Sequence, residues 1–234
     1  RSIRYALCDD RRTLLWLANQ RAVEYHPTLG PAENIYRPTH LVLALDPPAQ
    51  APFAAVVAVA HQVHTALTAC GLSAALKTSG SRGLHIVVPV ADGAAADDVA
   101  AATRALAARS EALDRSAATT AFLVEERAGK VFVDATRAGG ATVAAVYSPR
   151  LRPGTPVSFP LAWSDLDRAD PREFTVHTAP GLLSGGDPWA ETMPAPQQLP
   201  DHLVDEGHRI PVARVAAMHE GKRRARERRE QRQD

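Results

Sequence analysis

A glycine-containing turn between two apolar runs most strongly constrains how this chain can fold. Residues 77–89 read Lys-Thr-Ser-Gly-Ser-Arg-Gly-Leu-His-Ile-Val-Val-Pro, so a short strand near 74–77 leads through a tight turn into a strand over 84–90. Glycines let the backbone turn sharply and approach a ligand, and the neighbouring cations and hydroxyls can hold phosphate oxygens. The Gly-x-x-x-x-Gly-Lys-Ser/Thr spacing of a Walker A loop is absent. The turn is therefore a candidate anion site of another kind.

Apolar periodicity predicts helices and strands on both sides of this turn. An apolar strand over 40–45 ends at Asp46, where two prolines stop it. The pattern further predicts a short buried helix at 14–19, helices at 53–72 and 97–113, a hairpin of 122–125 with 130–134 around Ala128-Gly129, a strand at 142–147, an extended piece at 173–177 and a last helix from about 212.

Length and composition indicate one compact α/β (α+β) domain over 1–211, followed by a charged tail at 212–234. The mean hydropathy of −0.19 is ordinary for a soluble protein, and no apolar run approaches the roughly 18 residues that a membrane helix needs. The N-terminus has no signal-peptide hydrophobic region. Cys8 and Cys70 form no spaced pair, so we expect reduced core cysteines in a cytoplasmic protein.

The net charge of +1 hides an uneven distribution. Residues 222–234 hold seven Lys/Arg and three Asp/Glu, which leaves 20 basic and 23 acidic residues elsewhere. The body is therefore not a generally basic nucleic-acid binder, and local patches must hold any bound strand. The alternating tail is either a solvated helix or a non-specific phosphate-binding arm.

Two aspartates end predicted strands. Asp46 follows the apolar run at 40–45, and Asp134 follows the alternating run at 130–133. Two carboxylates at neighbouring strand ends are the oxygen ligands that Mg²⁺ or Mn²⁺ requires when it bridges substrate phosphates. The alternative is that each aspartate only caps a turn.

Several cationic residues could complete an anion site. Arg82 and His85 lie in the turn, Arg127 precedes the second aspartate, and Arg150 closes a Tyr-Ser-Pro-Arg segment. Together they would clamp a triphosphate and neutralise the charge that builds during phosphoryl transfer. Taken alone, Arg127 and Arg150 are better explained as exposed surface arginines, and a histidine such as His85 is more often a satisfied core residue. His26 carries little signal by itself.

These segments, in this order, resemble the polymerase domain of bacterial ligase D. That domain is the primase-polymerase module of non-homologous end joining and belongs to the archaeo-eukaryotic primase superfamily. The resemblance covers roughly residues 3–192 and rests on residues 13–19, 24–27, 45–48, 77–89, 127–134, 147–150, 156–158, 160–163 and 187–189.

The resemblance implies a primase-polymerase-type fold, with mixed sheets around a central cleft. It implies Mn²⁺ or Mg²⁺ at Asp46 and Asp134, which match the second and third metal carboxylates of the family. His85 matches the histidine of the Ser-Gly-x-x-Gly-Leu-His motif. The remaining positions that match nucleotide-holding residues are His26, Ser79, Arg82, Arg127 and Arg150.

The chain departs from the family pattern in three places. The family's Asp-Leu-Asp-Pro reads Ala44-Leu45-Asp46-Pro47 here, so the first carboxylate is missing. Relatives place an amide and an asparagine soon after the third aspartate, where this chain has Arg137, which either contacts phosphate or obstructs the pocket. Relatives also carry an N-terminal segment that meets the DNA end, so we expect the N-terminal part of the fold to be missing.

Two functions follow from the resemblance. The first is a metal-dependent, DNA-end-directed nucleotidyltransferase that adds (ribo)nucleotides to a 3′ end in DNA repair. The second is a catalytically degenerate homologue that binds nucleotide or DNA. Loss of one carboxylate would slow transfer by on the order of a thousandfold or more, which favours the second. The expected partners are DNA ends, nucleoside triphosphates, Ku and a separate DNA ligase, in a cytoplasmic, nucleoid-associated protein.

Overall fold

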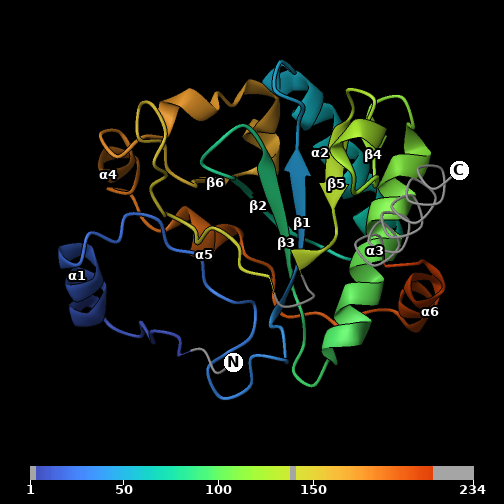
Figure 1. Cartoon of the computed structure of the whole chain (residues 1–234), viewed down its shortest axis with the longest axis horizontal. Helices are drawn as coiled ribbons and strands as arrows, with labels where there is room; N and C mark the ends of the chain where they lie inside the picture. Colours follow the sequence, from blue (N-terminus) through green and yellow to red (C-terminus); the bar gives the residue numbers. More distant parts are fainter. Residues whose placement is uncertain (1–3, 138–140, 213–234) are drawn as a thin grey trace, which may run out of the picture.

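The computed structural model describes residues 4–137 and 141–212 of the chain. Within them, one six-stranded mixed sheet has the order β4-β5-β1-β3-β2-β6 (Figure 1). Only β4 and β5 pair in parallel, and the other neighbours are antiparallel. The expected mixed α/β fold is therefore confirmed.

The described elements have the following bounds. The strands are β1 (His40–Asp46), β2 (Ala75–Thr78), β3 (Leu84–Pro89), β4 (Ala118–Thr119), β5 (Val131–Asp134) and β6 (Pro160–Leu161). The α-helices are α1 (Arg11–Asn19), α2 (Phe53–Ala69), α3 (Ala96–Leu113), α4 (Ala179–Leu182), α5 (Pro188–Thr192) and α6 (Asp201–Arg209), and the 3₁₀ turns are η1 (Val124–Glu126), η3 (Trp163–Arg168) and η4 (Pro171–Glu173). Within these two described ranges, no helix is both long and apolar enough to cross a membrane.

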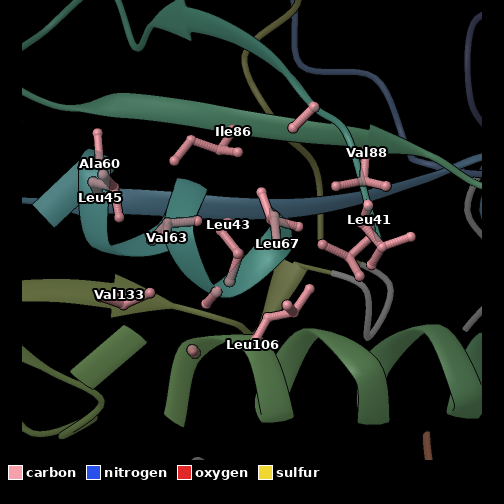
Figure 2. Packing of buried hydrophobic residues seen from close by; sticks show 14 of the residues in the cluster. Leu41, Leu43, Leu45, Ala60, Val63, Leu67, Ile86, Val88, Leu106 and Val133 are labelled. Atoms are coloured by element: carbon pink, nitrogen blue, oxygen red, sulfur yellow. The ribbon is translucent and has the colours of Figure 1, made fainter. Parts of the chain in front are cut away.

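Helices α2 and α3 cover one face of the sheet and form the main core with it. Leu41, Leu43 and Leu45 of β1 are fully buried and pack with Leu67 of α2 and Leu106 of α3 (Figure 2). Fully burying one leucine side chain contributes about 1.5–3 kcal/mol. Because successive strand residues face opposite sides, the even-numbered residues of β1 point away from these helices.

The opposite face of the sheet carries a smaller apolar cluster. Val42 of β1 packs there with Val87 of β3 and Val143, and Trp189 and Met193 partly cover them. Ala44 and Asp46 follow Val42 at two-residue steps and share its face. This is the face on which the polar strand residues gather.

The prediction of a hairpin from 122–125 and 130–134 is wrong for its first strand and correct for its second. β5 forms as expected, and the turn residues Ala128 and Gly129 have φ angles of 49° and 76°. The segment before the turn contains η1 instead of a strand. Its preceding carbonyl oxygens, on Ala121 and Phe122, accept hydrogen bonds from the Arg127 guanidinium at 3.2 and 3.0 Å. The outer neighbour of β5 is instead the parallel strand β4.

The region at 142–147 contains no strand, contrary to the prediction. Its amides at Val143 and Ala145 nevertheless donate to the carbonyl oxygens of Pro27 and Tyr25 at 3.2 and 2.9 Å. The extended piece at 173–177 makes a single bridge, between Pro156 and Thr175. Neither segment is extended throughout, because 146–147 and 176–177 form turns and Glu173 is the last residue of η4.

Exposure also corrects two predictions about the N-terminal region. Helix α1 forms, but it has no buried residue, and its Trp16 is 60% exposed. Cys8 is exposed, whereas Cys70 is buried as expected. Apolar spacing predicts that a helix forms, but it does not determine which element covers the helix. The last helix and the tail, both predicted from about residue 212, lie outside the described residues except for Val212.

Candidate functional site

A continuous row of residues crosses four strands on the face opposite the core. Asp134 of β5 pairs with Ala44 of β1, Ala44 also pairs with His85 of β3, and His85 pairs with Lys77 of β2. Directly paired residues of antiparallel strands share a face, so all four side chains point to the same side. Asp46 lies two residues beyond Ala44 and points there too. The sheet thus forms the floor of a polar site.

The two carboxylates of this floor have different environments. Asp134 is buried, and its Oδ1 accepts hydrogen bonds from the backbone amide and hydroxyl of Thr136 at 2.8 and 2.6 Å. Its Oδ2 forms a 2.8 Å ion pair with Arg137. Burial raises the pKa of Asp46, the nearby carboxylate of Asp134 raises it further, and Arg137 partly offsets the rise. The two aspartates are therefore electrostatically coupled across neighbouring strands.

The glycine turn is seated against the end of β1. A Cβ at Gly83 would lie 2.0 Å from the carbonyl oxygen of Leu45, and a Cβ at Gly80 would lie 2.6 Å from Cγ of Arg150. Gly80 also has a φ of +67°, which side-chain-bearing residues rarely adopt. Inside the turn, Oγ of Ser79 accepts two backbone amides at 3.2 Å each. These close approaches place the turn beside the carboxylates.

Glu24 contacts Arg150 and His26 at the edge of the site. Its Oε2 accepts from Nε of Arg150 at 3.1 Å and lies 3.0 Å from Nε2 of His26. The backbone amide of Leu151 donates to Oε1 at 2.7 Å. The hydrogen bond from the Leu151 amide is the largest cause that lowers the pKa of Glu24, and the contacts with His26 and Arg150 lower it further. The pKa of Glu24 is about 2. Arg150 also donates to the carbonyl oxygen of Ser79 at 2.6 Å, so its orientation is fixed from both sides.

Arg127 is held in place by a different set of contacts. Besides its two backbone carbonyl partners, its guanidinium carbon lies 3.8 Å from the ring centroid of Phe132 on β5. Such stacking is favourable for a guanidinium and restricts its motion. Arg82, in contrast, is exposed at the tip of the glycine turn. The site therefore combines oriented arginines with an exposed one.

The buried side chain of Lys77 contacts His85 on the neighbouring strand. Its Nζ lies 2.8 Å from Nδ1 of His85 and donates to the carbonyl oxygen of Ala144 at 2.9 Å and to Oγ of Ser158 at 2.6 Å. Burial lowers the pKa of Lys77 to about 7. Burial and then the charge of Lys77 hold the pKa of His85 well below its usual value. Local sequence patterns do not predict this network, because Ala144 and Ser158 come from segments distant in the chain.

These groups surround one cleft of about 380 Å³. Its lining includes Asp46 and all six predicted nucleotide-holding residues, namely His26, Ser79, Arg82, His85, Arg127 and Arg150. Asp134 is not part of the lining. Two further arginines in the described part of the chain, Arg137 and Arg152, also line the cleft. The sequence left the role of Arg137 open and missed Arg152, whose only signal is that it follows Arg150 in the same loop.

A family model for the LigD primase-polymerase domain matches residues 1–189 of the chain. The chain belongs to the LigD primase-polymerase family. The match spans the row of strand residues, the glycine turn and every arginine of the cleft. The family resemblance inferred from the ordered motifs is therefore confirmed.

Curated relatives and a solved structure agree with this membership. The LigD-type chain is 33% identical over 175 residues to the multifunctional non-homologous end joining protein LigD of Pseudomonas aeruginosa, which covers 73% of this chain and 21% of that protein. It is 29% identical over 209 residues to the LigD protein of Mycobacterium bovis, covering 86% and 28%. The polymerase domain from Mycobacterium tuberculosis ligase D in complex with DNA matches with a TM-score of 0.70 and 30% identity, covering 79% of this chain and 68% of that one. The chain therefore spans about a fifth to three tenths of its curated relatives.

LigD polymerase domains depend on metal ions, but the donors of this LigD-type chain do not fit a two-metal site. The side chain at position 44 has no oxygen, and both carboxylate oxygens of Asp134 already have partners. Within 4–137 and 141–212, no group of three or more His, Cys, Asp or Glu residues could hold a metal ion. Mg²⁺ sites usually combine one or two carboxylates with water and substrate phosphates, so these two aspartates fall short of the carboxylate set of a two-metal site.

Proposed function

We propose that this LigD-type domain binds a nucleoside triphosphate in its basic cleft and works at DNA ends in non-homologous end joining. The supporting observation is the convergence of arginines on one cleft of about 380 Å³. In the described part of the chain, the lining arginines are Arg82, Arg127, Arg137, Arg150 and Arg152. Guanidinium groups stay charged at neutral pH and offer forks of donors that match phosphate oxygens.

The arrangement of these cations favours a bound polyphosphate over a loosely attracted anion. Arg150 is oriented by Glu24 and Ser79, and Arg127 by backbone carbonyls and Phe132. Cations that are already oriented lose less side-chain entropy when a ligand binds. By family resemblance, the partners of the domain would be DNA ends, Ku and a separate DNA ligase.

Nucleotide binding is tested by titrating a fluorescent ATP analogue into the protein. We expect saturable binding, and we expect Arg150→Met to weaken it about tenfold or more because an oriented cation is lost. Arg168→Met is the matched control, since Arg168 lies outside the cleft and pairs with Asp165 at the surface. Absence of saturable binding, or equal affinities for the two variants, would contradict the proposal.

A second candidate function is transfer of the nucleotide to a DNA 3′ end. It is favoured by Asp46 and Asp134, which share one face of the sheet and are electrostatically coupled. In this candidate the two aspartates hold Mn²⁺ or Mg²⁺, which first requires Arg137 to leave Asp134. Without the family's first carboxylate, which Ala44 replaces, we expect transfer to be slower by on the order of a thousandfold.

Primer extension separates the two functions. The substrate is a DNA end with a recessed 3′ terminus in Mn²⁺, and the native chain is compared with Ala44→Asp and Asp46→Ala. Extension by the native chain that disappears in Asp46→Ala would establish transfer with two carboxylates. Extension only by Ala44→Asp would identify a binding domain whose catalytic defect is the missing carboxylate. No extension by any of the three would argue against transfer.

A further inference from the structure

Arg137 occupies the carboxylate that a metal ion would need. Its Nη2 lies 2.8 Å from Oδ2 of Asp134, while Oδ1 of the same carboxylate is saturated by two hydrogen bonds from Thr136. The Asp134 side chain is only 5% exposed, whereas that of Arg137 is 34% exposed. A divalent cation that binds Oδ2 of Asp134 would therefore compete with the guanidinium.

Arg137 lies between the carboxylate of Asp134 and the interior of the cleft. Asp134 lies in the sheet outside the cleft lining, and Arg137 sits on it and lines the cleft. A carboxylate therefore holds a cation, and that cation faces the space where phosphates would bind. In a metal-dependent site, the divalent ion has this intermediate place between carboxylate and phosphate.

Arg137 also retains capacity for a ligand. A guanidinium has five N–H donors in a planar fork, and the ion pair with Asp134 engages one nitrogen. Among the described residues, no further partner is recorded for its other two nitrogens. These nitrogens can therefore bind phosphate oxygens while Asp134 keeps the group in place.

We infer that the guanidinium of Arg137, seated on Asp134, replaces the divalent cation of this site, so that the cleft binds nucleoside triphosphate without metal. The inference rests on the proposed nucleotide binding and adds that this binding needs no Mn²⁺ or Mg²⁺. The replacement is consistent with Ala44, which sits directly opposite Asp134 and provides no second carboxylate for an ion. The guanidinium neutralises the carboxylate of Asp134, whereas a divalent ion would have to share the Asp134 oxygens with Arg137 and Thr136.

The first test compares nucleotide binding by the native chain in EDTA and in Mn²⁺. A fluorescent ATP analogue is titrated under both conditions, and we expect the two dissociation constants to agree within about threefold. Binding that appears only with Mn²⁺ would overturn the inference and leave the proposed nucleotide binding intact. Absence of binding under both conditions would instead contradict the proposed function itself.

The second test removes the guanidinium. In Arg137→Met, Asp134 loses its cation, so we expect binding in EDTA to weaken about tenfold or more and Mn²⁺ to restore part of the loss. Arg152→Met should weaken binding by the same factor in EDTA and in Mn²⁺, because Arg152 does not pair with Asp134. Unchanged affinity of Arg137→Met in EDTA, or the same metal dependence in both variants, would overturn the inference.

A third measurement uses Mn²⁺ alone as the probe and needs no nucleotide. Electron paramagnetic resonance counts the free Mn²⁺ that remains when the protein is added. We expect the native chain to take up little Mn²⁺ and Arg137→Met with Ala44→Asp to take up at least tenfold more at the same concentration. Tight uptake of Mn²⁺ by the native chain would contradict the replacement of metal by Arg137.

Discussion

The ammonium nitrogen of Lys77 lies 2.8 Å from Nδ1 of His85 on the neighbouring strand, beneath the basic cleft. Ala144 and Ser158 supply the other two acceptors, so the three ammonium donors each have one partner. While Lys77 is protonated, its ammonium donates to Nδ1 of His85, and a neutral His85 ring then has its proton on Nε2. A buried lysine thus determines the tautomer of a cleft residue.

This buried lysine predicts a pH dependence of stability. Burial lowers the pKa of Lys77 from 10.5 to about 7, so between these values the unfolded chain binds a proton that the folded chain does not. The free energy of unfolding should then rise with pH across this window, by on the order of 5 kcal/mol at most. Urea denaturation at pH 7, 8, 9 and 10 measures the slope, and Lys77→Met should remove it. Lys130→Met is the control, and identical slopes in the native chain and Lys77→Met would contradict the prediction.

Glu24 should affect nucleotide binding without touching the nucleotide. Glu24→Gln removes the charge that orients Arg150 and His26, so we expect the affinity for an ATP analogue to fall about five- to tenfold. Glu33→Gln changes an exposed glutamate elsewhere and should leave affinity within about twofold. Titration at constant ionic strength checks both. If Glu24→Gln and the native chain bind the analogue with equal affinity, the hydrogen bond to Ser79 alone is enough to orient Arg150.

Gly83 should be intolerant of any side chain. A Cβ at this position would meet the carbonyl oxygen of Leu45 at 2.0 Å, so Gly83→Ala must push the turn away from β1. We expect a loss of about 2 kcal/mol or more in the free energy of unfolding, together with weaker nucleotide binding. Gly185→Ala is the control, because a Cβ there meets no atom within 4 Å. Similar denaturation midpoints for the two variants would refute the predicted clash.

Arg127 should not be replaceable by lysine. A lysine keeps the charge but cannot reproduce both carbonyl hydrogen bonds and the stacking on Phe132. We therefore expect Arg127→Lys to weaken nucleotide binding about fivefold, while Arg152→Lys, at an exposed position, changes it less than twofold. Binding titrations on folded variants check the difference. If Arg127→Lys binds the nucleotide analogue as tightly as the native chain, only the positive charge at position 127 matters for binding.

Much of the fold could be predicted from local patterns. The apolar run at 40–45 and the alternating run at 130–134 became β1 and β5, and the helices at 53–72 and 97–113 became α2 and α3. Strand alternation and helix periodicity reflect backbone geometry, which neighbouring residues specify. The parallel pairing of β4 with β5 was not predictable, because β4 has only two residues and is too short to show an alternating pattern.

By itself, the sequence determined the family, the glycine turn and the candidate residues around it, because these depend on residue type and order. Only the tertiary structure decided which charges meet. Glu24 reaches Arg150 across 126 positions, and the Lys77 network closes across 67 and 81 positions. Arg137 and Asp134 are close in sequence, but the effect of their ion pair depends on Ala44. This residue of the neighbouring strand β1 pairs with Asp134 and provides no carboxylate. Charge pairing depends on how strands and loops pack, and local sequence patterns do not encode that packing.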